Sequence, residues 1–254
     1  MLLTVDIGNT NITLGAFDGK KLVFTARLAT DEHRTDDQYA IEVKNVLSLH
    51  NVEASDFDGA IIGSVVPVIT RFMSNAIELL FGITPLVLGP GVKTGLNILI
   101  DNPAQLGADL VAGSVAAKAY YPLPNAVCDL GTASTIFVLD AAGNMIGGVI
   151  YPGVRTSMDA LVAKTALLQQ VSFDAPNKVI GKNTIDCMQS GVVYGAAALL
   201  DGMMDRIEKE VGQPMTAIAT GGYAQRIIKN CVRKFEYADN LVLEGLRIIW
   251  EKNR

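Results

Sequence analysis

Two short turns carry the residue types that phosphate binding requires. Asp6-Ile-Gly-Asn-Thr10 and Asp129-Leu-Gly-Thr132 each follow an apolar run. A glycine at a strand–turn–strand lets the backbone approach a bulky anion, so that backbone N–H groups and Thr or Asn side chains can donate to phosphate oxygens. An aspartate in the same turn can hold Mg²⁺ through water, and Mg²⁺ draws phosphates to it. Two such turns facing each other across a cleft predict a nucleoside triphosphate site.

A third glycine turn, Gly221-Gly222, follows the apolar run 216–220 and precedes a helical pattern. This position suits contact with an adenosine or a phosphate group. One Asp–Gly–Thr turn alone is weak evidence, since a glycine is often needed only to form a hairpin. That simple explanation does not account for an aspartate before and a threonine after the glycine in both turns.

The elements around the turns repeat along the chain. Strands are expected at 2–6, 11–17 and 21–26, and again at 126–129, 135–140 and 145–149, with Gly-containing hairpins in both sets. Asp6 and Asp129 are 123 residues apart, about half the chain. The pattern predicts a duplicated domain, with domains at 1–120 and 121–254 and a boundary near the proline-rich segment 121–124.

Other runs alternate between strand and helix patterns. Thr35-Asp-Asp-Gln38 has the form of a capping box and predicts a helix to about residue 49. The alternation predicts an α/β fold. Further strands are expected at 59–66, 85–88 and 216–220, and further helices at 70–81, 107–120, 157–166, 184–211, 223–231 and 243–252.

Composition excludes several classes of protein. The 254 residues are 50% hydrophobic with a net charge of −5, which argues against global disorder and against a general nucleic-acid binder. The longest apolar stretch, 59–69, is too short to span a membrane and contains Pro67. No secretory signal is visible, and the three cysteines form no pair that suggests a disulfide. A cytoplasmic protein without membrane or nucleic-acid partners is therefore expected.

The layout resembles the superfamily of acetate and sugar kinases, actin and heat-shock chaperones, and no P-loop motif is present. Over nearly the whole chain it is more closely similar to the type III pantothenate kinases. The motifs that carry this resemblance are Asp6–Thr10, Arg34-Thr35, Ser64–Pro67, Asp101–Pro103, Gly107–Asp109, Asp129–Thr132, Gly147-Gly148, Tyr151–Gly153, Ile180–Thr184, Gln189–Gly191, Ala219–Gly222 and Leu243–Arg247.

The resemblance implies two actin-like (ribonuclease H-like) domains, whose mixed sheets are flanked by helices, with a cleft between the domains. It implies ATP-dependent phosphorylation of pantothenate to 4′-phosphopantothenate, the first step of coenzyme A biosynthesis, by a homodimer whose substrate site is near the interface. ATP and Mg²⁺ are the expected cofactors, with K⁺ or NH₄⁺ as a monovalent cation at Asp129 and Mg²⁺ held by Asp6 through water. The residues expected to bind ATP are Asp6, Ile7, Gly8, Asn9, Thr10, Asn11, Ile12, Thr13, Gly131, Thr132, Gly221 and Gly222.

By the same resemblance, Asp109 is the base that accepts the proton of the pantothenate hydroxyl, and Gly107, Ala108 and Thr184 line the substrate site. A carboxylate suffices for this, since phosphoryl transfer depends mostly on positioning and charge neutralisation. The positive end of the predicted helix at 107 is expected to favour the ionised form of Asp109. The simpler explanations are that Asp109 and Thr184 are only helix caps.

Two departures fall at the substrate positions of the family. Leu110 stands where the family usually has an arginine, and Ile100 where it usually has a tyrosine. Loss of the guanidinium removes a forked donor suited to a carboxylate. Two alternatives to a pantothenate kinase therefore stay open: a kinase for a related hydroxyl acceptor, and a non-catalytic paralogue that binds nucleotide and acts in regulation.

Overall fold

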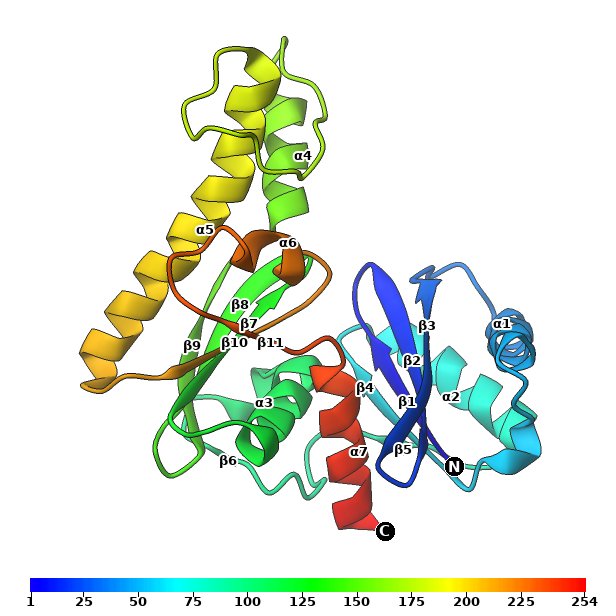
Figure 1. Cartoon of the computed structure of the whole chain (residues 1–254). Coiled ribbons are helices and arrows are strands. Elements are labelled where there is room, and N and C mark those ends of the chain that lie inside the picture. The colour runs from blue at the N-terminus through cyan, green and yellow to red at the C-terminus, as the bar shows by residue number, and fades with distance from the viewer. The chain divides into compact units, whose positions relative to one another are not determined.

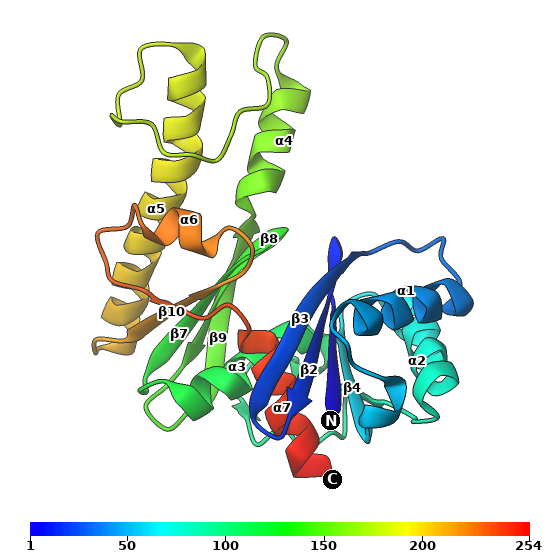
Figure 2. The same ribbon diagram turned by 45° about the vertical axis from the view of Figure 1, so that its right-hand side comes forward.

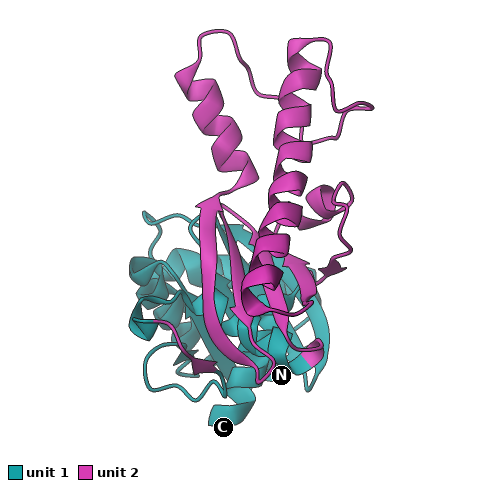
Figure 3. Ribbon diagram, turned by 90° about the vertical axis from the view of Figure 1, so that its left-hand side faces the viewer, with its two compact units in different colours: residues 1–96, 101–119, 240–254 teal, residues 97–100, 120–239 magenta.

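The computed structural model describes residues 1–254, which divide into two compact units (Figure 3). Unit 1 comprises residues 1–96, 101–119 and 240–254, and unit 2 comprises residues 97–100 and 120–239. Segment 240–254 thus belongs to the unit formed mainly by the N-terminal half, and segment 97–100 to the other. The division of the sequence into domains 1–120 and 121–254 stays a prediction.

Unit 1 is built on a five-stranded mixed sheet in the order β3-β2-β1-β4-β5 (Figure 1). β1 and β2 are antiparallel, as are β2 and β3, whereas β4 runs parallel to β1 and β5 parallel to β4. The strands are β1 (Leu2–Ile7), β2 (Asn11–Asp18), β3 (Lys21–Ala29), β4 (Gly59–Ser64) and β5 (Leu86–Val87).

Helices cover both faces of this sheet (Figures 1 and 2). α1 (Asp36–Leu49) and α2 (Pro67–Phe81) pack on one face, where alternate residues of β1 and β2 join the buried core. α7 (Leu241–Asn253) contacts β1, β2 and β4 from the other face, and α3 (Ala108–Tyr120) lies against α7. The expected capping box is confirmed, because Thr35 and Gln38 exchange side-chain-to-backbone hydrogen bonds at the start of α1.

Unit 2 repeats the same strand order with one strand added. Its six-stranded sheet is ordered β11-β10-β7-β8-β9-β6. β7 and β8 are antiparallel, as are β8 and β9, whereas β10 runs parallel to β7. The expected duplication is therefore confirmed in topology. The strands are β6 (Asn97–Ile98), β7 (Asn125–Leu130), β8 (Ala133–Leu139), β9 (Asn144–Pro152), β10 (Thr216–Thr220) and β11 (Glu236–Tyr237).

The helices of unit 2 are α4 (Val154–Lys164), α5 (Thr184–Val211) and α6 (Ala224–Ile228). Buried residues of all three pack against β7, β8 and β10 to form the second core. The chain also has two short 3₁₀ helices, η1 (Ala54–Asp56) and η2 (Pro103–Gln105). No helix of the chain combines the length and the apolar character that a membrane crossing would need.

Most helix and strand boundaries differ slightly from those expected. α2 begins at Pro67 rather than residue 70. Proline suits the first turn of a helix, because the N–H groups of that turn make no hydrogen bond within the helix and proline lacks only this group. α4 begins at Val154 and α7 at Leu241, earlier than expected, whereas α6 is confined to Ala224–Ile228. The two-residue strands β6 and β11 were not expected, since so short a strand leaves no periodic pattern.

Candidate functional site

The Asp6–Thr13 turn of unit 1 joins β1 to β2. Asp6 lies between Thr13 and Gly63 in the sheet register. The N–H of Gly8 donates to the carbonyl oxygen of Asn11 (3.0 Å), and Thr30 Oγ1 donates to the carbonyl oxygen of Gly8 (2.7 Å). These bonds hold the turn in one conformation while Asn9, Thr10 and Asn11 remain exposed.

Two residues expected to bind ATP are core residues of this hairpin. The side chains of Ile7 and Ile12 are fully buried in the first core. Only their backbone groups are therefore available to a nucleotide, and their side chains fix the two strands that carry the turn.

Asp109 belongs to the same unit as that turn. It is the second residue of α3, whose first residue, Ala108, lies over Gly63 of β4. Its carboxylate accepts a hydrogen bond from the N–H of Leu110 (2.9 Å) and folds back over Gly107, where a Cβ would overlap it. Glycine at 107 therefore leaves the space that this carboxylate occupies.

Burial raises the pKa of Asp109 above its ordinary value, although the backbone N–H groups of Asp109 and Leu110 act in the opposite direction. The N–H groups at the helix start favour the ionised form, as expected, but desolvation by burial has the larger effect and leaves the pKa raised. Asp109 is also not the N-cap residue, because it is the second residue of α3 rather than the residue before the helix, although its carboxylate accepts a hydrogen bond from the N–H of Leu110.

In unit 2, backbone encloses the Asp129–Thr132 turn closely. Gly221, at φ +94°, packs against the carboxylate of Asp129 and the backbone of Leu130, and a Cβ there would overlap the carboxylate. Gly153 packs in the same way against the carbonyl groups of Gly131 and Thr132. The N–H of Gly153 and the hydroxyl of Thr156 both donate to the carbonyl oxygen of Thr132 (3.1 and 2.7 Å). The turn is thus braced, which here means that the backbone of Gly221 and the backbone of Gly153 are both packed closely against it.

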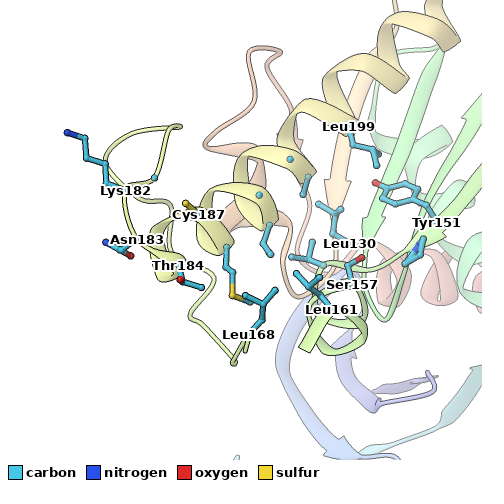
Figure 4. Close-up of a pocket in the computed structure, with 18 residues that line it drawn as sticks. Leu130, Tyr151, Ser157, Leu161, Leu168, Lys182, Asn183, Thr184, Cys187 and Leu199 are labelled. Carbon is cyan, nitrogen blue, oxygen red and sulfur yellow. The ribbon is translucent and has the colours of Figure 1, made fainter. Parts of the chain in front are cut away.

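Thr184 lines a pocket of about 930 Å³ in unit 2, between α4, α5 and the segment that joins them (Figure 4). Leu130, Tyr151, Leu161 and Leu199 form much of its apolar wall. Thr184 does not cap α5, because Asn183 accepts the hydrogen bond from the N–H of Asp186 (2.9 Å). Its hydroxyl is therefore not needed as the helix cap.

The structure thus gathers the expected residues into three places. The Asp6–Thr13 turn and Gly107–Leu110 both belong to unit 1, Asp129–Thr132 adjoins Gly221 in unit 2, and Thr184 lies in the unit 2 pocket. Ile100 follows β6 and belongs to unit 2, whereas Gly107–Leu110 belongs to unit 1.

The pocket is the feature that sequence reasoning missed. Cys187, Gly191, Gly195 and Leu199 recur every four residues along α5 and line it. This spacing places them on one helix face, which is the signal that the sequence offered. Several side chains of the surrounding segments are strongly exposed and apolar: Leu167 (91%), Ile180 (83%) and Val179 (65%).

No group of three or more His, Cys, Asp or Glu side chains that could hold a metal ion is present. Mg²⁺ is usually held by one or two carboxylates together with substrate phosphates, rather than by a cage made of protein alone. Asp6, half-buried at the exposed turn, fits that mode. The carboxylate of Asp129 is also an oxygen donor, of the type that hard cations prefer.

Comparison with known proteins identifies the family of the chain. The family model for type III pantothenate kinase matches residues 2–206. A protein from an Exiguobacterium strain named type III pantothenate kinase is 42% identical over 255 residues, which cover 100% of both chains.

Solved structures with low identity share the fold. One is a conserved Campylobacter jejuni protein described as belonging to the Baf family (21% identity, TM-score 0.62, 99% of this chain and 98% of that one). Another is the activator of 2-hydroxyisocaproyl-CoA dehydratase from Clostridium difficile, with bound ADPNP (10% identity, TM-score 0.56, 99% and 96% covered). The expected actin-like fold and kinase activity are confirmed, and the chain belongs to the type III pantothenate kinase family.

Proposed function

We propose that the chain transfers the γ-phosphoryl group of ATP to the primary hydroxyl of pantothenate, and that Asp109 accepts the proton of that hydroxyl. The observation that carries this role is the half-buried carboxylate at the start of α3, in the same unit as the Asp6–Thr13 turn. A base must be placed where it can reach the nucleophile and must be ionised at the working pH. A raised pKa lies closer to the working pH, and it makes the carboxylate a stronger base than that of an exposed aspartate.

The exposed part of the Asp6–Thr13 turn supplies donors for phosphate oxygens. Asn9, Thr10 and Asn11 present backbone N–H groups and polar side chains at the surface of the hairpin. Asp6 is proposed to hold Mg²⁺ through water, where the ion neutralises charge on the phosphates. In unit 2, the exposed Thr132 and the Gly221-Gly222 turn are proposed to contact ATP, and Asp129 to hold K⁺ or NH₄⁺.

We also propose that two copies form the active enzyme and that Thr184 contributes to the substrate site near their interface. Thr184 is exposed beside the pocket of unit 2, whereas Asp109 belongs to unit 1. The exposed apolar side chains of Leu167, Val179 and Ile180 surround this region, and exposed apolar clusters are typical of protein interfaces. Sedimentation of the wild type and of an Ile180→Asp variant tests the assembly, because a charge at an apolar interface should shift it toward monomer.

The activity is tested by ADP release with purified protein, Mg²⁺, K⁺ and pantothenate. Turnover that requires pantothenate is expected, and replacing K⁺ with Na⁺ should lower it if Asp129 holds the cation. The absence of turnover from folded protein at millimolar pantothenate would contradict the proposal.

One observation favours a second candidate function. Leu110, directly after the proposed base, is half-buried and apolar, so it offers no donor to the carboxylate of pantothenate. A kinase for a related hydroxyl-bearing amide or acid is therefore the second candidate, and a panel of acceptors in the same assay separates the two. ATP binding without transfer to any acceptor would instead indicate a regulatory paralogue.

A further inference from the structure

The C-terminal helix α7 packs closely on the sheet of unit 1. Three of its side chains, spaced so that they share one helix face, each lie over a glycine of the sheet. A Cβ built at each of these glycines would come within 3.0 Å or less of the side chain above it, so a larger residue there would have to displace that side chain. The pairs are Leu243 over Gly15, Leu246 over Gly63, and Trp250 over Gly59.

The helix is also held by charge. Arg247 is only 2% exposed, and its guanidinium pairs with Glu244 (3.1 Å) and Glu251 (2.6 Å) on the same helix. The guanidinium carbon lies 5.8 Å from the ring centre of Phe17 in β2. The position of α7 against the sheet is thus fixed by the packing of its side chains on the three glycines and by the buried guanidinium of Arg247.

The same helix meets α3 through a fourth glycine. Gly245 is buried against Ala112, and a Cβ at 245 would overlap the carbonyl group of Ala112 and reach its Cα at 3.0 Å. The obstacle is backbone, which has no rotamer by which to move aside. Ala112 lies one turn after Asp109, on the part of α3 that follows its start.

We propose that Gly245 is a positioning residue for the phosphoryl transfer, because its missing side chain sets the separation of α3 from α7 and thereby holds Asp109 in place. This inference rests on the proposed role of Asp109. The first turn of α3 also rests on the sheet, since Ala108 lies 3.7 Å from the position of a Cβ at Gly63. A shift at Ala112 is therefore transmitted within one turn to the carboxylate.

The test compares two glycine-to-alanine variants at the same helix pair. Gly245→Ala must push α3 away by about 1 Å, and a misplacement of that size costs up to about 100-fold in rate. Gly113→Ala is the matched control, because a Cβ at 113 meets Leu241 and Val242 only at 3.9 and 4.0 Å. Alanine also favours a helix over glycine, so this control should be at least as stable as the wild type.

We expect Gly245→Ala to lower kcat by about 10- to 100-fold while KM for ATP changes less than about twofold. Gly113→Ala should keep the wild-type kcat. Unchanged kcat in folded Gly245→Ala, or an equal loss in both variants, overturns the proposal.

A milder variant covers the case in which Gly245→Ala does not fold. Gly63→Ala places a methyl 3.0 Å from Leu246 Cδ2, a contact that a small shift of α7 relieves. It should fold and lose kcat by a few-fold. If this variant has the wild-type kcat and Gly245→Ala does not fold, the contact of Gly245 with Ala112 serves stability alone, and the proposal is overturned.

Failure of this inference is distinguishable from failure of the proposed function. If Asp109→Asn retains activity, the base is misassigned and both fall. If Asp109→Asn is inactive while folded Gly245→Ala is fully active, only the positioning role of Gly245 is lost.

Discussion

The two units repeat one strand order, β3-β2-β1-β4-β5 in unit 1 and β9-β8-β7-β10-β11 in unit 2, but the surroundings of their Asp–Gly turns differ. In unit 1, the turn is held by two hydrogen bonds at Gly8, and its next three residues are exposed. In unit 2, Gly153 and Gly221 press backbone against the corresponding turn. Unit 1 also contains the half-buried Asp109, which follows Ala108, the residue that lies over Gly63 of β4.

From this difference we infer a division of roles between the two turns. The turn of unit 1 is accessible and shares its unit with a carboxylate of raised pKa, which suits it to the reacting end of a substrate. The turn of unit 2 is braced and so suits rigid contact with the part of a ligand that does not react. Replacements in the exposed turn of unit 1 should therefore affect mainly turnover, and replacements of the glycines packed against the unit 2 turn should affect mainly stability.

The largest effect on turnover is expected from Asp109→Asn. Removal of a general base typically costs about 10²- to 10⁴-fold in rate, and the isosteric amide keeps the fold. Coupled ADP release measures kcat, and Asp18→Asn, at the exposed end of β2, is the control that should leave it unchanged. A fully active Asp109→Asn variant would remove the chemical distinction between the units.

The second prediction sets the two turns directly against each other. Gly221→Ala combines a φ of +94° with overlap on Asp129, so it should lower the free energy of unfolding by about 2 kcal/mol or more. Gly8→Ala meets only the carbonyl oxygen of Asn11, at 3.2 Å, and should cost about 1 kcal/mol or less while raising KM for ATP. Urea unfolding and ATP titration measure the two quantities. Equal destabilisation by both variants would contradict the proposed difference in bracing.

A smaller effect is expected from Leu110→Arg in unit 1. A hydrogen bond to a charged group contributes about 1.5–3 kcal/mol, so a guanidinium there should lower KM for pantothenate by about tenfold or more. The half-buried position of Leu110 leaves part of the side chain accessible for this contact. An unchanged or higher KM, with wild-type kcat, would favour a different acceptor.

The repeated strand order could be predicted from the sequence because its signals are local. Apolar runs, Gly-containing hairpins and the capping box at Thr35 each depend on a few consecutive residues. The resemblance supplied the place of Asp109 beside Gly107, and the space that a Cβ at 107 would take from its carboxylate gives the physical reason for that pair.

Other features could not be predicted because they depend on residues distant in the chain. The net pKa of Asp109 follows from burial in the folded unit, which outweighs the local helix donors that the sequence made visible. The packing of Gly245 on Ala112 joins helices more than 100 residues apart, and nothing in either segment alone indicates it. The 930 Å³ pocket likewise requires α4 and α5 to be placed together.

The smallest effect concerns the pH dependence of Asp109. Because burial raises its pKa in the folded state, the protonated form, which cannot accept a proton, persists to higher pH than for an exposed aspartate. The acid limb of kcat should therefore lie above the ordinary aspartate pKa of about 3.9. The unfolded chain ionises at that lower value, so ionisation of Asp109 destabilises the fold as pH rises from the ordinary to the raised pKa. The difference in Tm, Asp109→Asn minus wild type, should therefore increase over that pH window and then level off. A difference that stays constant would mean that the pKa of Asp109 is not shifted by folding, and a difference that falls with rising pH would mean that it is lowered. Either result would contradict the raised pKa on which the contrast with unit 2 depends.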